Sequence, residues 1–95
     1  MQLEVAAHAL DDLKEIARYI QRDKPGAAIH FVERIWREFG IIAKHPMIFP
    51  AADGAQALFR RGRVGEYMIL FRVIEGAVRI ERVVHGRRNL HNQLP

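Results

Sequence analysis

Hydrophobic and polar side chains first mark out a short strand and an amphipathic helix. Residues 2–6 alternate polar with apolar positions, as a short half-buried strand does. From Ala9 to Arg22 the apolar residues recur at helical spacing, which predicts a helix with one buried face. In that helix Asp11 and Asp12 would occupy the first turn, where the helix dipole favours negative charge.

A second amphipathic helix is predicted after the break in the pattern at residues 23–26. Asp23 is suited to cap this helix, and Pro25 fits a first turn because its missing N–H is not needed there. The helix runs to about Lys44, with Trp36 beside a broad apolar face. That face consists of Ala28, Phe31, Val32, Ile35, Phe39 and Ile42. So short a connection between two helices predicts an antiparallel hairpin.

The second half of the chain is predicted to form a three-stranded meander that follows a loop over residues 45–56. The strands cover residues 57–63, 66–74 and 77–85, with turns at 64–65 and 75–76. The middle strand is apolar on both faces, so it should lie centrally in the sheet. Residues 86–95 are expected to form a short helix or to be partly frayed.

These elements predict one α+β domain over residues 1–95. An N-terminal strand is followed by an antiparallel helical hairpin packed on one face of a mainly antiparallel sheet, which the C-terminal meander completes. A chain of 95 residues is expected to build one hydrophobic core rather than two. Hydrophobic residues make up 49 % of the sequence, too large a share for a disordered chain.

The chain contains no cysteine, which excludes disulfides, thiolate metal sites and thiol nucleophiles and fits a reducing compartment. Its first residues lack the basic region and apolar core of a signal peptide, and no apolar run approaches the roughly 20 residues of a membrane span. We therefore expect a cytoplasmic protein with no direct membrane association. The histidines show no metal-ligand spacing, so neither a metal site nor a cofactor is expected.

Positive charge is concentrated in the second half of the chain. Residues 57–95 carry eight basic and three acidic side chains, whereas residues 1–56 carry seven basic and eight acidic ones. The eight are all arginines: Arg60, Arg61, Arg63, Arg72, Arg79, Arg82, Arg87 and Arg88. Because a guanidinium binds a carboxylate or phosphate with two bonds at once, they indicate a surface for an anionic partner. Nucleic acid, an anionic surface and an acidic protein all remain candidates.

Regular alternation along the last strand would turn Arg82 to the same side as the apolar Val78 and Ile80. A buried, unpaired guanidinium is very costly, so we expect either a carboxylate partner or a β-bulge that redirects the side chain. A structural or partner-binding role is favoured over catalysis. Arg60 and Arg61 point to opposite faces of their strand, so at most one of them can join Arg82.

His85 ends the last strand near these arginines, where an imidazole could act as a general base for a ribose hydroxyl. A hydrogen-bonded histidine at a strand end is the favoured interpretation, because no pair of proton donor and acceptor can be identified. Trp36 fits either the core or an exposed anchor for a partner, since indole is enriched in such anchors.

Two strand motifs stand out, Val64-Gly65-Glu66-Tyr67-Met68-Ile69-Leu70-Phe71-Arg72-Val73 and Ile80-Glu81-Arg82-Val83-Val84-His85-Gly86-Arg87-Arg88. They accompany Asp12-Leu13, Ile16, Tyr19-Ile20, Pro25, Ala27-Ala28, Phe31-Val32, Ile35, His45-Pro46 and Leu58-Phe59-Arg60. In this order they resemble the ParE branch of the RelE/ParE toxin superfamily, the plasmid-stabilisation toxins encoded beside an antitoxin. The resemblance covers nearly the whole chain. One departure is Met47-Ile48-Phe49, where the family often has a glycine soon after the proline.

The resemblance implies the toxin component of a type II toxin–antitoxin system that inhibits DNA gyrase by binding rather than by catalysis. The RelE branch instead cleaves ribosome-bound messenger RNA, with basic residues and a tyrosine or histidine near the C-terminal end. Residues 86–91 contain no tyrosine, which favours the ParE interpretation. In a RelE-like endoribonuclease, Arg60, Arg72 and Arg82 would hold the phosphate and His85 would handle a proton.

The resemblance also implies a ParD-like antitoxin of the ribbon-helix-helix type, whose acidic C-terminal segment folds as it binds. The residues expected to contact antitoxin or target are Arg60, Arg61, Arg72, Arg82, His85, Arg87, Arg88 and Trp36. No recognition helix with exposed basic residues stands out, so operator DNA is expected to be reached only through the antitoxin. A degenerate, non-toxic homologue that only takes part in operator binding is the remaining alternative.

Overall fold

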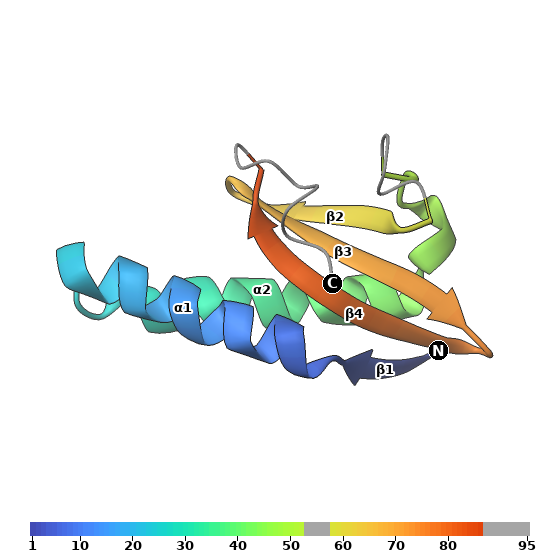
Figure 1. Ribbon diagram of the computed structural model, residues 1–95, viewed down its shortest axis with the longest axis horizontal. Helices are drawn as coiled ribbons and strands as arrows, with labels where there is room; N and C mark the ends of the chain where they lie inside the picture. Colours follow the sequence, from blue (N-terminus) through green and yellow to red (C-terminus); the bar gives the residue numbers. More distant parts are fainter. Residues whose placement is uncertain (53–57, 87–95) are drawn as a thin grey trace.

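The computed structural model describes residues 1–52 and 58–86, and in them a helical hairpin lies against one face of a four-stranded sheet (Figure 1). The elements are β1 (Gln2–Val5), α1 (Ala7–Asp23), α2 (Ala27–Lys44), a short 3₁₀ turn η1 (Pro46–Ile48), β2 (Arg60–Val64), β3 (Tyr67–Ile74) and β4 (Ala77–His85). This order of strand, two helices and three strands confirms the predicted α+β fold class.

The strands lie in the order β1-β4-β3-β2, so β3 is an interior strand as its two apolar faces predicted. Strands β2, β3 and β4 form the expected antiparallel meander, whereas β1 pairs with β4 in parallel, with Gln2 opposite Ala77 and Val5 opposite Ile80. The meander turns tightly at Glu75 and Gly76, which both have positive φ (48° and 80°), as a two-residue hairpin turn of the primed type requires.

The main core lies between the hairpin and the sheet. It joins the buried stripes of both helices to one face of β3 and β4, and its largest fully buried side chains include Ile35, Phe39, Ile42, Ile69, Phe71 and Ile80. We call the other side of the sheet the helix-free face. A second, smaller cluster of Ala52, Leu70 and Val84 lies there, flanked by Phe59 and Met68. Neither described helix is both long enough and apolar enough to cross a membrane.

Both predictions about helix starts were wrong. The N–H of Ala6 donates to Ile80 O (2.9 Å), and α1 begins at the next residue, so Asp11 and Asp12 fall beyond the first turn. Asp23 does not cap α2 but is the last residue of α1. The N-cap of α2 is Gly26, whose left-handed φ of 93° reverses the chain between the helices.

Strand β2 is also shorter than predicted. It begins at Arg60 rather than at residue 57, and residues 53–57 lie outside the described part of the chain. The turn after it lies at Gly65 and Glu66, one residue later than expected, and the positive φ of Gly65 (58°) fits that turn. The expected tail, residues 86–95, is described only at Gly86.

Candidate functional site

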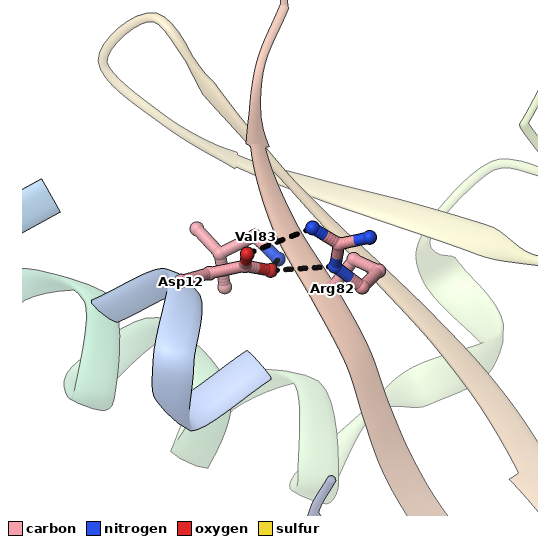
Figure 2. Close-up of polar contacts among 3 residues, drawn as sticks. All are labelled: Asp12, Arg82 and Val83. Atoms are coloured by element: carbon pink, nitrogen blue, oxygen red, sulfur yellow. Dashed lines mark hydrogen bonds and ion pairs between the residues drawn. The ribbon is translucent and has the colours of Figure 1, made fainter. Parts of the chain in front are cut away.

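The open edge of β4 is held by a side chain of α1. Pairing between β1 and β4 ends where Val5 lies opposite Ile80, so within residues 1–52 and 58–86 no strand lies beside the next residues of β4 on that edge. There the Asp12 carboxylate accepts the N–H of Val83 and the Nε and Nη2 groups of Arg82, each at 2.8 Å (Figure 2). One carboxylate thus pairs the backbone N–H of Val83, which has no strand partner there, and neutralises the largely buried guanidinium of Arg82.

A β-bulge turns Arg82 away from the core side, where regular alternation would place it, and its guanidinium reaches Asp12 at the open edge of β4. Leu70 lies opposite Arg82 while Phe71 lies opposite Ile80, so β4 contains one extra residue, Glu81. Both alternatives expected for Arg82, a carboxylate partner and a bulge, therefore occur together. The hydrogen bond to Asp12 raises the pKa of Arg82, which keeps the guanidinium charged.

Four arginines point to the helix-free face of the sheet. The register places Arg61 opposite Leu70 and Arg63 opposite Met68, both of which belong to the small cluster on that face. Side chains alternate along a strand, so Arg72 and Arg79, which adjoin the core residues Phe71, Val78 and Ile80, point the same way. We call the surface formed by Arg61, Arg63, Arg72 and Arg79 the arginine face.

Glu81 links two of these arginines. Arg72 and Arg79 lie directly opposite one another in the register, an arrangement in which like charges repel. The Glu81 carboxylate lies between them, 2.6 Å from Arg72 Nη2 and 3.3 Å from Arg79 Nε. The Arg72 guanidinium also stands 5.6 Å over the Phe59 ring. Two cations and one anion leave this group with a net positive charge.

Arg61 carries the one buried side-chain donor that lacks a hydrogen-bond partner in the described residues, its Nε. It adjoins the small apolar cluster through its cross-strand neighbour Leu70. A buried N–H without an acceptor is costly, and such a group in a native fold calls for an explanation.

The other predicted site residues lie elsewhere. Arg60 lies opposite Phe71 and so points to the helix side, where its Nη1 donates to Phe49 O (2.6 Å) and fixes the loop before β2. Trp36 is 42 % exposed on α2, with its ring edge-on to Phe39 at 5.0 Å. Arg87 and Arg88 lie outside the described residues.

His85 lies in a groove of about 750 Å³ between α1 and the paired ends of β3 and β4. Its Nε2 is 3.1 Å from Glu66 Oε2, and its ring packs edge-on against Tyr67 at a centroid distance of 5.3 Å. The α1 side of the groove is lined by Asp12, Glu15, Ile16, Arg18, Tyr19, Ile20 and Arg22. His85 is thus a hydrogen-bonded strand-end histidine, and the groove around it carries charges of both signs.

Only two of the four residues of the endoribonuclease alternative come together. Arg82 and His85 line the same groove beside α1, where Asp12 occupies the Arg82 guanidinium. Arg60 and Arg72 lie elsewhere and point to opposite faces of the sheet. Within residues 1–52 and 58–86 no group of three histidine, aspartate or glutamate side chains could hold a metal ion.

Sequence reasoning missed Asp12 and Glu81, the two carboxylates that position the arginines. Asp12 lies three residues after Ala9 and four before Ile16, on the buried stripe of α1. An acidic residue on the apolar side of a helix predicts that a positively charged side chain pairs with it, because a buried charge without a partner is costly. Glu81 offers no comparable signal, because its role depends on the bulge.

Known proteins similar to this chain belong to toxin–antitoxin systems. A family model described as "ParE toxin of type II toxin-antitoxin system, parDE" matches residues 3–90. Among solved structures, the chromosomal ParDE system of P. aeruginosa is similar at a TM-score of 0.78 and 18 % identity, covering 90 % of this chain and 95 % of that one. The RelBE2 toxin–antitoxin complex of Mycobacterium tuberculosis is similar at a TM-score of 0.58 and 23 % identity, covering 88 % and 95 %. No curated protein sequence matches.

Proposed function

Because this chain belongs to the ParE toxin family of type II toxin–antitoxin systems, we propose that it arrests growth by binding DNA gyrase and that a ParD-like antitoxin holds it inactive. The observation that carries the proposal is the family match over residues 3–90, which also confirms the predicted membership of the RelE/ParE superfamily. In this proposal the toxin performs no reaction on its target.

The arginine face supplies a physical means for the antitoxin to bind. Its guanidinium groups suit carboxylates, and the partly exposed Phe59 and Met68, which flank the small buried cluster, suit apolar side chains. An acidic segment that also carries apolar residues could meet both requirements and fold as it binds. A carboxylate of that segment could bind the Arg61 guanidinium, and it would meet the buried Nε once the groups that cover this atom move aside.

The variant Arg61→Ala tests this contact. A hydrogen bond to a charged group contributes roughly 1.5–3 kcal/mol, so affinity for the cognate antitoxin should fall about 10- to 100-fold. The stability of the free toxin should not fall, because the variant removes a donor that has no partner. Titration calorimetry measures the affinity, and Arg37→Ala, at an exposed position of α2, is the matched control. Equal affinities for both variants would contradict this assignment of the antitoxin surface.

The target is tested separately by a supercoiling assay with purified gyrase and relaxed plasmid. We expect excess toxin to reduce supercoiling, and toxin premixed with its antitoxin to leave it unchanged. Full supercoiling at a large excess of folded toxin would remove gyrase as the target. The antitoxin arm does not depend on this result, so the two parts of the proposal can fail independently.

One observation favours a second candidate, a ribosome-dependent endoribonuclease. His85 lies 3.1 Å from Glu66, so a carboxylate orients an imidazole that could act as a general base. The arginines of this candidate do not focus on one phosphate, which weighs against it. Toeprinting on translating ribosomes decides the matter: cleavage that His85→Ala abolishes would support the nuclease, and absence of cleavage would exclude it.

A further inference from the structure

One side of α2 is exposed along its whole length. Ile29, Glu33, Trp36, Gly40 and Lys44 recur every three or four residues, so they share one side of the helix, and all five are exposed. We call this set the α2 stripe. It combines large apolar groups with one acid and one base, since Ile29 is 67 % exposed and Trp36 is 42 % exposed.

Trp36 projects from the α2 stripe as a knob, whereas Gly40, which has no side chain, leaves a notch in it. The Trp36 ring is fixed by its edge contact with Phe39, yet much of it faces solvent. One turn further on, a Cβ at Gly40 would meet no atom within 4 Å, so no neighbour in the described chain requires a glycine there. Glycine inside a helix costs roughly 1 kcal/mol relative to alanine. A close approach by another helix would account for both features.

We propose that the α2 stripe is the interface of a homodimer in which α2 packs antiparallel to α2 of a second copy. Trp36 of each copy would lie on Gly40 of the other. A twofold interface makes each contact twice, so contacting residues must be placed symmetrically about one point on the helix. Within α2, the pairs Trp36 with Gly40 and Glu33 with Lys44 are centred at Glu38 and half a residue beyond it, as this symmetry requires. Ile29 would lie near the end of the other copy's α2, close to η1, where Met47 is 62 % exposed.

The charges favour a second copy over an unrelated partner. Within residues 1–52 and 58–86 neither Glu33 nor Lys44 forms an ion pair, so each is available to the other across the interface. Antiparallel packing places Glu33 of one copy beside Lys44 of the other, whereas parallel packing would place the two Glu33 side chains beside each other. An unrelated partner would require no symmetry between the two halves of the stripe.

The dimer leaves the arginine face uncovered, because that face lies on the side of the sheet away from both helices (Figure 1). Two copies joined through α2 would each keep a free sheet surface for an antitoxin. The dimer is therefore compatible with the proposed antitoxin surface. It makes no use of gyrase, so it does not depend on which target the toxin binds.

Sedimentation equilibrium of the full chain tests the proposal. We expect a reversible dimer within the range up to about 1 mM. In Gly40→Gln the added side chain fills the notch, which should weaken the dimer roughly tenfold or more. The space at Gly40 is open in the single chain and glutamine favours helix, so thermal stability of the monomer should hold or rise. A chain that stays monomeric to about 1 mM overturns the proposal, as does a Gly40→Gln dimer as tight as the parent's.

Charge reversal tests the register. Glu33→Lys or Lys44→Glu alone should each weaken the dimer roughly three- to tenfold, because each places like charges together at two symmetric points. The double variant should restore it, and failure to do so overturns the antiparallel register. Ile29→Gln should also weaken the dimer, whereas Ile41→Gln, exposed on another side of α2, is the matched control and should not. Equal effects of these two variants would contradict an interface on the α2 stripe.

Discussion

Replacing Asp12 with asparagine isolates the contact that fastens the helical hairpin to the sheet. In the parent chain one carboxylate accepts three hydrogen bonds, two from the Arg82 guanidinium and one from the N–H of Val83, all at 2.8 Å. Asparagine keeps the shape of the side chain but removes its charge. Its amide group also turns a donor toward the donors of Arg82 or Val83.

The expected cost follows from burial and from the number of bonds lost. Asp12 is buried, and the Arg82 side chain is only 15 % exposed, so water replaces the lost acceptor poorly. Removing one partner of a buried pair costs about 3–5 kcal/mol, and a bond to a charged group contributes about 1.5–3 kcal/mol. One oxygen of asparagine can still accept a bond, so we expect a loss of about 3 kcal/mol. The free energy of unfolding of a small domain is roughly 5–15 kcal/mol, so the variant should fold but be markedly less stable.

Urea unfolding followed by circular dichroism measures this loss, and the melting temperature should fall by roughly 10–20 °C. Asp11→Asn is the matched control: it makes the same chemical change one residue away at an exposed position and should stay within about 0.5 kcal/mol of the parent. Hydrogen exchange at the Val83 amide should accelerate in Asp12→Asn alone. If the two variants were equally stable, the Asp12 junction would not hold α1 to β4.

Two further changes test the sheet. Glu81→Gln leaves Arg72 and Arg79 directly opposed, but both are substantially exposed, so we expect a loss of only about 0.5–1 kcal/mol at low salt. That loss should shrink in concentrated NaCl, and a loss independent of salt in urea titrations would contradict an electrostatic cause. Gly62→Val should destabilise by about 1–3 kcal/mol, because even a Cβ at Gly62 would lie 3.0 Å from Ile42 Cδ1. Thermal melts check it, and a Gly62→Val variant as stable as the parent would show that the core relaxes around the added atoms.

The order of elements could be predicted because each element carries its own local pattern. Strand β3 is apolar on both faces, which placed it inside the sheet, and Glu75-Gly76 marked a two-residue turn. The position of β1 could not be predicted in the same way. Its parallel pairing joins Gln2 to Ala77, and nothing in residues 2–6 alone specifies a partner so far along the chain.

The site was less predictable because its contacts are long-range. Local rules assigned Asp12 to the helix dipole, yet its partner Arg82 lies 70 residues away. The pattern around Arg82 did predict that a carboxylate or a bulge was needed, since a bare guanidinium could not remain beside Ile80. It could not say which carboxylate, because the choice depends on how α1 crosses β4 (Figure 2).

Arginines that look alike in the sequence therefore divide into two groups with different roles. Arg60 and Arg82 are bound by the protein itself, to Phe49 O and to Asp12. The four of the arginine face are spread over β2, β3 and β4, with Glu81 among them. Phosphoryl chemistry needs cations focused on one phosphate, whereas a peptide partner meets cations at several points along its length. The spread over three strands beside an apolar cluster therefore favours recognition of an acidic segment over catalysis.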